Sequence, residues 1–401
     1  MGVRPALLFY CQHSVGLGHL TRSYALCAAL AKRFRVVLAC GGALPDGIAP
    51  PTGPELVALP PLGVGAAARF VSHDPRYTLE RAREARAELL LRTFRSLRPA
   101  AVLVEMFPFG RAKFARELVP LLEETRRSGA IAACSLRDIL VTGRPNQRAH
   151  DERACALANA HLDVVLMHSD PRMCRLEDTF APHAALSVPV RYTGFVVNDA
   201  RHRASRRSRV VVSAGGGLVG EPLLRAAVEA HRMSWSATGL PMRVVAGPLL
   251  PEPAWRRLRA AAAGQPGLEL RRAVPDLGAE LRAASASISQ CGYNTALEVV
   301  RSRVPALVVP YATAEEDEQR RRARRLEQLG ALRVLDPEWL EPAALARELE
   351  RLPAFRPARP PIDLDGAHST CRQLWELVTV PAAPADAQAR PALLVTRTSP
   401  A

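Results

Sequence analysis

The chain of 401 residues lacks the sequence features of several large classes of protein. No stretch approaches the roughly 18 consecutive apolar residues that a membrane-spanning helix needs. The apolar start, residues 1–10, is short and runs into Gln12, His13 and a glycine-rich turn rather than the small-residue cleavage site of a secretory signal peptide. We therefore expect a cytoplasmic protein, and a peripheral contact with the inner face of the membrane stays compatible with the sequence.

Metal-binding patterns are also missing. The eight cysteines are scattered and form no C-x-x-C pair, which argues against a zinc site or a disulfide framework and for reduced thiols. The Asp-x-Asp sequence at Asp363–Asp365 lies in a Pro-rich stretch and does not follow a predicted strand. We predict neither a metal ion nor a cofactor.

Lys-rich patches interleaved with aromatic residues, as expected of a nucleic-acid surface, do not occur. The chain is nevertheless basic, with 54 Lys and Arg against 39 Asp and Glu and a net charge of +15. Such a charge raises the local concentration of anionic partners in general. Because most of it is Arg in an Ala/Arg/Pro-rich composition, we predict no nucleic-acid partner.

The sequence does contain one α/β pattern, a strand followed by a glycine turn and a helix, at two places along the chain. A buried-strand run at residues 6–11 is followed by a turn with Gly16 and Gly18, an apolar-periodic helix at 20–31 and a strand at 35–39. The pattern restarts with a strand at 210–213, a Gly215–Gly217 turn and a helix at 221–231. This order predicts an α/β protein with two Rossmann-like, doubly wound parallel-sheet domains facing each other across a cleft.

The predicted division follows from these two openings. Residues 1–197 form the N-terminal domain, the basic, turn-prone residues 198–209 a linker, and residues 210–380 the C-terminal domain. The Pro/Ala-rich residues 381–401 are predicted to be disordered.

The C-terminal half carries a candidate anion site in residues 289–298. The segment leaves a strand, turns on Gly292 and enters a helix through Asn294 or Thr295, which are good cap residues. A helix N-terminus offers free N–H groups and a positive dipole end to a diphosphate. Glu298 could accept both hydroxyls of a ribose, although its spacing from Thr295 alone is better explained by a capping box.

A second polar pair follows the strand predicted at 304–311. Glu318 and Gln319 open an Arg-rich helix whose charge pattern also suits an ordinary solvated helix. Because they lie just past the carboxyl end of a strand, they are placed to hydrogen-bond sugar hydroxyls in a crevice.

The N-terminal half offers a candidate base. His19 follows Gly16 and Gly18 at the start of the first helix, where a positive dipole end favours the neutral imidazole. A neutral imidazole can remove the proton of an attacking hydroxyl. The alternative is a helix-start histidine bonded to a nearby carbonyl, but the flanking glycines favour the catalytic interpretation.

Other polar residues end neighbouring strands. Glu105 is predicted to face the cleft as an acceptor contact or second catalytic carboxylate, and whether Glu105 or His19 is the base stays open. Arg137 and Asp138 either bind the acceptor or form salt bridges. His168 is predicted to be a satisfied core histidine. An apolar lip for the acceptor, or else an edge of the core, is predicted from four residues: Phe70, Met106, Phe107 and Phe109.

Residues 291–330 resemble the C-terminal domain of the glycosyltransferase family that includes the N-acetylglucosaminyltransferase forming lipid II, which has the GT-B architecture. The resemblance lies in an ordered series of Gly292, Asn294-Thr295, Glu298, Val304-Pro-Ala-Leu-Val-Val-Pro310 and Gln319. It implies that Glu298 binds the ribose of UDP, Thr295 a phosphate, and Gln319 with Glu318 the donor sugar. It also implies that the backbone of Val274 meets the uracil and that Gly215, Gly216 and Gly217 lie beside the donor phosphates. The family often has two glutamines where this chain has Glu318-Gln319, so the resemblance leaves the donor sugar open.

The G-x-G-H sequence ending at His19 resembles the same enzymes and a related nucleotide-sugar hydrolase whose equivalent histidine is the base. Three further segments, 105–111, 135–140 and 192–194, resemble a bacterial group of predicted glycosyltransferases, which extends the resemblance over residues 7–374. The whole implies an inverting, metal-independent hexosyltransferase that moves a sugar from a UDP-sugar to a small-molecule or lipid-linked hydroxyl acceptor. A nucleotide-sugar hydrolase or epimerase is the alternative, and the oligomeric state is not indicated.

Overall fold

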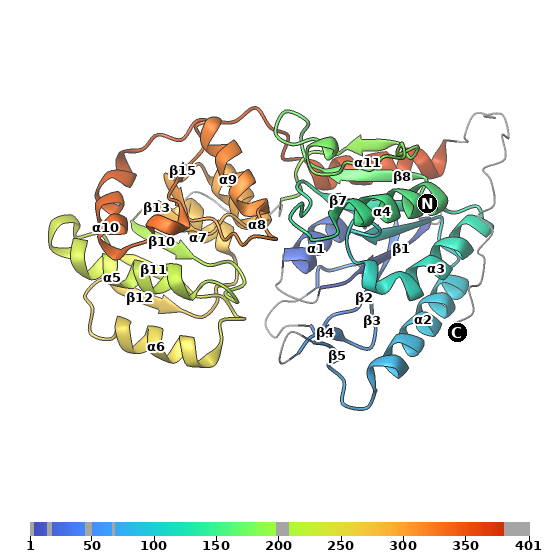
Figure 1. Ribbon diagram of the computed structural model, residues 1–401, viewed down its shortest axis with the longest axis horizontal. Helices are drawn as coiled ribbons and strands as arrows, with labels where there is room; N and C mark the ends of the chain where they lie inside the picture. The colour runs from blue at the N-terminus through green and yellow to red at the C-terminus, as the bar shows by residue number, and fades with distance from the viewer. Residues whose placement is uncertain (1–3, 14–17, 45–49, 66–68, 198–207, 381–401) are drawn as a thin grey trace.

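The computed structural model describes residues 4–13, 18–44, 50–65, 69–197 and 208–380 and consists of two α/β domains (Figure 1). The N-terminal domain is built on a parallel sheet with the strand order β3-β2-β1-β6-β7-β8-β9. Its strands are β1 (Ala6–Cys11), β2 (Arg35–Cys40), β3 (Glu55–Ala58), β6 (Ala101–Glu105), β7 (Ile131–Arg137), β8 (Val164–His168) and β9 (Val190–Tyr192). A separate antiparallel hairpin joins β4 (Leu62–Val64) to β5 (Phe70–Ser72).

Alternate residues of the central strands enter two cores, one on each face of this sheet. Leu8 and Tyr10 of β1 point to the core covered by α2 (Leu79–Leu97), α3 (Ala115–Arg127) and α4 (Gln147–His161). Leu7 and Phe9 point to the core beneath α1 (Gly18–Leu30). Because both faces are covered, these strands read as nearly continuous apolar runs.

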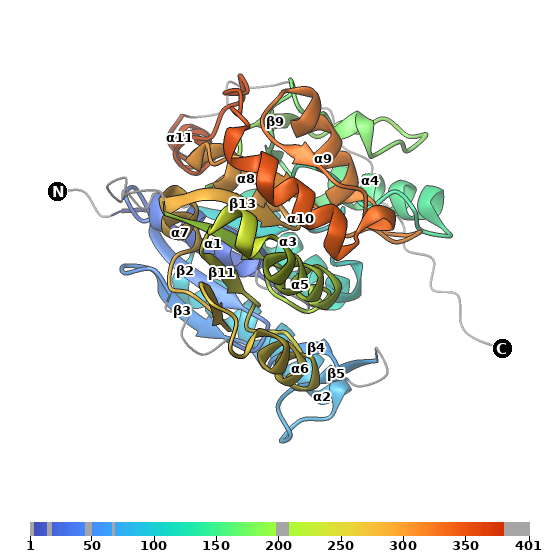
Figure 2. The same ribbon diagram turned by 90° about the vertical axis from the view of Figure 1, so that its left-hand side faces the viewer.

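The C-terminal domain repeats the plan with the strand order β12-β11-β10-β13-β14-β15. Its strands are β10 (Arg209–Ser213), β11 (Met242–Val245), β12 (Leu268–Arg271), β13 (Ala284–Ser289), β14 (Ala306–Val308) and β15 (Arg333–Val334). Helices α5 (Glu221–Thr238), α6 (Glu252–Ala262) and α10 (Pro342–Arg351) lie toward the viewer in Figure 2. Three more complete it: α7 (Leu277–Ala283), α8 (Tyr293–Ser302) and α9 (Glu318–Gln328). The predicted pair of doubly wound parallel sheets is confirmed.

The last described helix, α11 (Gly366–Thr379), crosses back to the N-terminal domain (Figure 1). Cys371 and Leu374 enter the core beneath α1, and the Trp375 ring lies 5.7 Å from that of Phe34. The predicted C-terminal domain, residues 210–380, therefore needs correction at its end, because the apolar face of α11 is buried against the other domain. A bridge between Val196 and Asp365 marks where the outgoing and returning chains meet.

Some predictions fall on residues that are not described. Gly16, most of the predicted linker and the predicted disordered tail lie outside the described ranges. All eight cysteines are described, and all are buried and free. Within the described ranges, no helix is long and apolar enough to cross a bilayer.

Candidate active site

The candidate site forms where the strand order of each sheet reverses direction. In the N-terminal sheet this point lies between β1 and β6, and in the C-terminal sheet between β10 and β13. Ligands of open α/β sheets bind outside the carboxyl ends of strands at such points. His19 follows β1 and Glu105 ends β6, whereas Gly215 follows β10 and Gly292 follows β13.

His19 and Glu105 form a hydrogen-bonded pair. His19 lies in the first turn of α1, and its Nδ1 is 2.6 Å from Glu105 Oε1. The His19 side chain keeps 16% of its surface exposed, whereas Glu105 is fully buried. The sequence left open which of the two residues is the base. Of the two, only His19 has exposed surface, so it is the one that a substrate could reach.

Two arginines complete this centre, and neither was singled out from the sequence. Arg22, one helical turn after His19, donates from Nη2 to the same Glu105 oxygen. Arg111 lies on the other side, with Nε 3.9 Å from Glu105 Oε2. For Arg22 the sequence did hold a signal, because its three-residue spacing from His19 puts both side chains on one face of the helix. Nothing in the sequence around Arg111 pointed to Glu105.

These charges set the protonation of the pair. Burial alone raises the pKa of Glu105, but His19, Arg22 and Arg111 outweigh it and lower that pKa to about 2. Burial lowers the pKa of His19 to about 3, with Glu105 opposing the shift and Arg111 adding to it. An ionised Glu105 can only accept, so the short bond requires the proton of the neutral imidazole on Nδ1. Nε2 is therefore left as the basic nitrogen.

On the other side, the N-terminus of α8 is the candidate anion site. Its N-cap is Gly292, which makes no side-chain cap bond, so the prediction that Asn294 or Thr295 caps this helix is wrong. Thr295 occupies the third helical position, and the capping box between Thr295 and Glu298 is excluded for the same reason. Among the described residues, the N–H groups of residues 293–295 have no acceptor, so they could bind an anion.

The glycine turn of residues 215–217 lies beside this helix end. A Cβ built on Gly215 would lie 3.8 Å from Thr295 Oγ1. Gly215 and Gly217 have positive φ, and a Cβ on Gly217 would come within 2.5 Å of the Ala246 carbonyl. The turn therefore requires glycine for its own backbone, and Gly216 completes it.

The N-termini of α1 and α8 meet across the domain interface. Asn294 Nδ2 donates to the carbonyl oxygen of Gly18 at 3.1 Å. Gly18 is the residue before His19, so the histidine pair and the α8 anion site adjoin each other.

Glu298 lies deeper along α8, against α7. Its carboxylate approaches Gly278 so closely that a Cβ there would meet Oε2 at 2.4 Å, and the Arg282 guanidinium lies 3.7 Å away. Val274, in the loop before α7, is partly exposed. The geometry thus puts Glu298 next to the helix that the Val274 loop enters.

The predicted sugar-binding and acceptor-side pairs contact each other. Arg137 donates to Glu318 from both terminal nitrogens, and Asp138 accepts two bonds from Arg322 at 2.7 and 2.9 Å. Gln319 Oε1 accepts from the backbone N–H groups of Cys291 and Tyr311 at 3.0 and 3.2 Å. Arg137 and Asp138 therefore form salt bridges, one of the two roles considered for them. They do so because α9 of the C-terminal domain faces the end of β7.

Of the two interpretations of the four apolar residues, an edge of the core holds for three of them. Phe107 and Phe109 are fully buried, Met106 is nearly so, and all three belong to the core of the N-terminal domain. Phe70 is partly exposed and packs edge-on against Phe114. His168 is a core histidine as predicted, bonded to Ser135 at 2.7 Å and to Thr193 at 2.9 Å.

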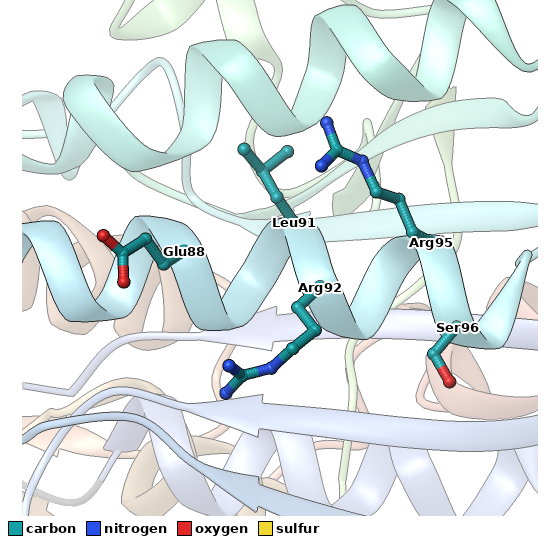
Figure 3. A pocket seen from close by; sticks show the side chains of 5 residues that line it. All are labelled: Glu88, Leu91, Arg92, Arg95 and Ser96. Atoms are coloured by element: carbon teal, nitrogen blue, oxygen red, sulfur yellow. The ribbon is translucent and has the colours of Figure 1, made fainter.

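Two hollows in the described chain lie away from these residues. One of about 620 Å³ runs along the outer side of α2 and is lined by Glu88, Leu91, Arg92, Arg95 and Ser96 (Figure 3). Another of about 300 Å³ lies where the chain crosses between domains, beside Asp170, Tyr192 and Asp363. In the described ranges no three His, Cys, Asp or Glu side chains are grouped as metal ligands.

Comparison with known proteins supports the architecture. Residues 269–360 match the glycosyltransferase family 28 C-terminal domain, a segment that contains Gly292, Glu298 and Gln319. No curated protein sequence matches the chain significantly.

Several solved structures share the fold over both domains. The calicheamicin glycosyltransferase CalG4 has a TM-score of 0.58 at 18% identity, covering 94% of each chain. MurG of Acinetobacter baumannii has a TM-score of 0.56 at 16% identity, covering 93% of this chain and 100% of its own. A Listeria monocytogenes protein assigned as a UDP-N-acetylglucosamine 2-epimerase has a TM-score of 0.59 at 14% identity, covering 93% and 96%. The chain therefore has the GT-B fold, and its C-terminal domain resembles family 28.

Proposed function

We propose that this protein is an inverting glycosyltransferase that moves a sugar from a UDP-sugar to a hydroxyl acceptor, with His19 as the general base. The observation that carries the proposal is the contact between the two helix N-termini through Asn294 and Gly18. It brings a buried carboxylate–histidine pair next to a helix end suited to a diphosphate.

In the proposed reaction the acceptor binds on the side of the N-terminal domain. His19 Nε2 takes the proton of the acceptor hydroxyl as its oxygen attacks the anomeric carbon from the face opposite the diphosphate. The new C–O bond forms, the bond between the anomeric carbon and the diphosphate oxygen breaks, and its electron pair leaves with UDP. Glu105 holds the imidazole and stabilises the imidazolium that results.

The leaving charge would fall on backbone dipoles. The N–H groups at the start of α8 and the turn of Gly215, Gly216 and Gly217 would meet the diphosphate, which requires no metal. A diphosphate beside His19 would also raise the low pKa of this imidazole toward neutrality, because an opposite charge favours the protonated form. We propose the remaining donor contacts as predicted: Thr295 to phosphate, Glu298 to ribose, Val274 to the base, and Glu318 with Gln319 to the sugar.

Two substitutions separate the base from the donor site. His19→Ala should lower turnover at least about 100-fold while leaving the affinity for UDP unchanged. Glu298→Ala should weaken UDP binding about tenfold or more, because it removes the acceptor of two ribose hydroxyl bonds. Steady-state kinetics and calorimetry with UDP measure the two effects. Near-normal turnover of the His19 variant would remove the mechanism, and unchanged affinity of the Glu298 variant would remove the ribose contact.

Nucleotide-sugar hydrolysis or epimerisation is the second candidate, because the same histidine could activate water or abstract a ring proton. Incubation with UDP-sugars in the absence of an acceptor separates the functions. Free sugar or an epimer produced at a catalytic rate would favour this candidate over transfer.

We propose that the reaction needs no metal ion or cofactor, and turnover that survives excess EDTA would agree with this. The acceptor is a hydroxyl of a small or lipid-linked molecule, and the cytoplasm, with or without contact at the inner membrane face, is the proposed location. A screen of nucleotide-sugars by thermal shift would identify the donor.

A further inference from the structure

Arg22 links the histidine pair to the C-terminal domain. Its side chain is buried, and its guanidinium donates to Glu105 Oε1, the atom that also receives the His19 bond. The same guanidinium lies 5.3 Å from the centre of the Tyr293 ring. A planar guanidinium can stack on an aromatic ring while it donates in its own plane, which an ammonium cannot do.

Tyr293 belongs to one domain by sequence and is tied to the other by its hydroxyl. It is the first residue of α8, at the proposed diphosphate site. Its hydroxyl donates to the His168 carbonyl at 3.1 Å and accepts from the Val196 N–H at 3.0 Å. The Arg322 guanidinium, paired with Asp138 across the interface, lies 5.8 Å from the same ring.

The contacts therefore form a continuous series from the interface to the imidazole. Asp138 holds Arg322, both arginines contact Tyr293, and Arg22 holds the Glu105 oxygen that orients His19. Within this series, as far as the described residues show, the domains meet near His19 only where Arg22 contacts the Tyr293 ring. If the domains separate, Arg22 loses this support.

We propose that Arg22 is a positioning residue of the reaction: in cation–π contact with Tyr293, it fixes Glu105 so that His19 is held as a base while the donor domain is in place. The inference rests on the proposed function, since it assumes that His19 is the base. It adds that the C-terminal domain not only binds the donor but also supports the base in the other domain.

The charged groups around His19 make its pKa a measurable property of the Arg22 contact. The imidazole is faced by Glu105 from β6, by Arg111 from the loop after β6 and by Arg22 from its own helix, while α8 contributes the uncharged Asn294 and Tyr293. Arg22 lowers the pKa of His19, so removing its charge should raise that pKa. This shift checks that the Arg22 charge acts on the imidazole, whereas the kcat of Arg22→Lys, which keeps the charge, checks the positioning.

The experiment uses three single variants of the full chain, one double variant and a control. Arg22→Lys keeps the charge but loses the planar stack, and Arg22→Gln loses both. Tyr293→Leu removes the ring. Arg33→Lys is the matched control, because Arg33 stacks on Trp375 at 5.4 Å, far from the site.

We expect Arg22→Lys and Tyr293→Leu each to lower kcat about tenfold or more, with the UDP Kd and donor KM within about twofold of the starting protein. Arg33→Lys should keep nearly normal kcat. The double variant R22K/Y293L should be no more than about twofold slower than the slower single one, because both remove the same contact. Multiplied losses in the double variant, or normal kcat in Arg22→Lys, would overturn the inference.

Nitrogen NMR of His19 provides a readout that does not depend on turnover. In Arg22→Gln the imidazole should titrate at higher pH than in the starting protein, and in Arg22→Lys its pKa should stay close to the starting value. An unshifted titration in Arg22→Gln would contradict the inference. His19→Ala, measured alongside, tests the proposed function itself: near-normal turnover there would remove the base, whatever the Arg22 variants do.

Discussion

At the residue scale, Glu105 decides what His19 can do. The carboxylate lies at the end of β6, without exposed surface, and receives His19 and Arg22 on one oxygen and Arg111 near the other. Two guanidinium groups keep it ionised despite burial. Because it can then only accept, the imidazole has one allowed neutral tautomer, with the free lone pair on Nε2.

Glu105→Gln tests this role. An amide can offer either its oxygen or its nitrogen to His19, so the tautomer is no longer fixed, and the imidazolium loses its counter-charge. We expect kcat to fall about 100-fold or more, with UDP affinity unchanged. The pKa of His19 should fall further, because Glu105 raises it. Glu55→Gln, which removes an exposed partner of Arg35, is the control. A kcat within threefold of normal would contradict the role.

At the element scale, local pattern was enough to predict the strands that carry the site but not the start of its helices. The first strand was predicted with the observed bounds, and Glu105 ends a strand as predicted. The start of α8 was misplaced, because Asn294 and Thr295 are strong cap residues and Gly292 a weaker one. The turn from β13 ends at Gly292, so tertiary structure, not cap preference, sets the first helical residue.

Gly292 itself has no structural need to be glycine. Its φ of −61° suits any residue, and a Cβ there would meet no atom of the described residues within 4 Å. If a diphosphate binds against this helix end, that open space is where a methyl group would intrude. Gly292→Ala should therefore leave the melting temperature unchanged and weaken UDP binding about tenfold, or about 1.4 kcal/mol.

Gly239→Ala is the matched control with the opposite result. Gly239 also has open space around its Cβ position, but its φ of +56° is left-handed and it ends α5. Alanine there should cost about 1 kcal/mol of stability and leave UDP binding unchanged. Thermal unfolding and calorimetry on the pair measure both effects. An unaltered UDP Kd in Gly292→Ala would remove α8 as the diphosphate site.

At the scale of the whole molecule, the contacts between domains were the least predictable part. Arg322 is one of several arginines in α9, and nothing local distinguishes the one that is fully buried from its exposed neighbours. Its partner Asp138 lies 184 residues earlier in the chain. The burial of Phe107 and Phe109 was equally unpredictable, because apolar residues at the edge of a cleft and at the edge of a core give the same local sequence.

Breaking the pair of Asp138 and Arg322 on one side should strongly destabilise the assembled domains. Both side chains are almost completely buried, and Arg322 also donates to the Cys291 carbonyl at 2.8 Å. Burial raises the pKa of Asp138, but Arg322 outweighs it and holds that pKa below its usual value. The aspartate is therefore ionised at neutral pH, and its removal leaves a buried guanidinium without a counter-charge.

Asp138→Asn should accordingly lower the free energy of unfolding by about 3–5 kcal/mol, measured by urea denaturation. The double variant D138L/R322M should recover most of this loss, because it removes both charges and fills the space with apolar atoms. Glu84→Gln, which breaks an exposed pair with Arg81, should change stability by less than about 1 kcal/mol. A single Asp138 variant as stable as this control would mean that water reaches Arg322 and that the domains are not held together by this pair.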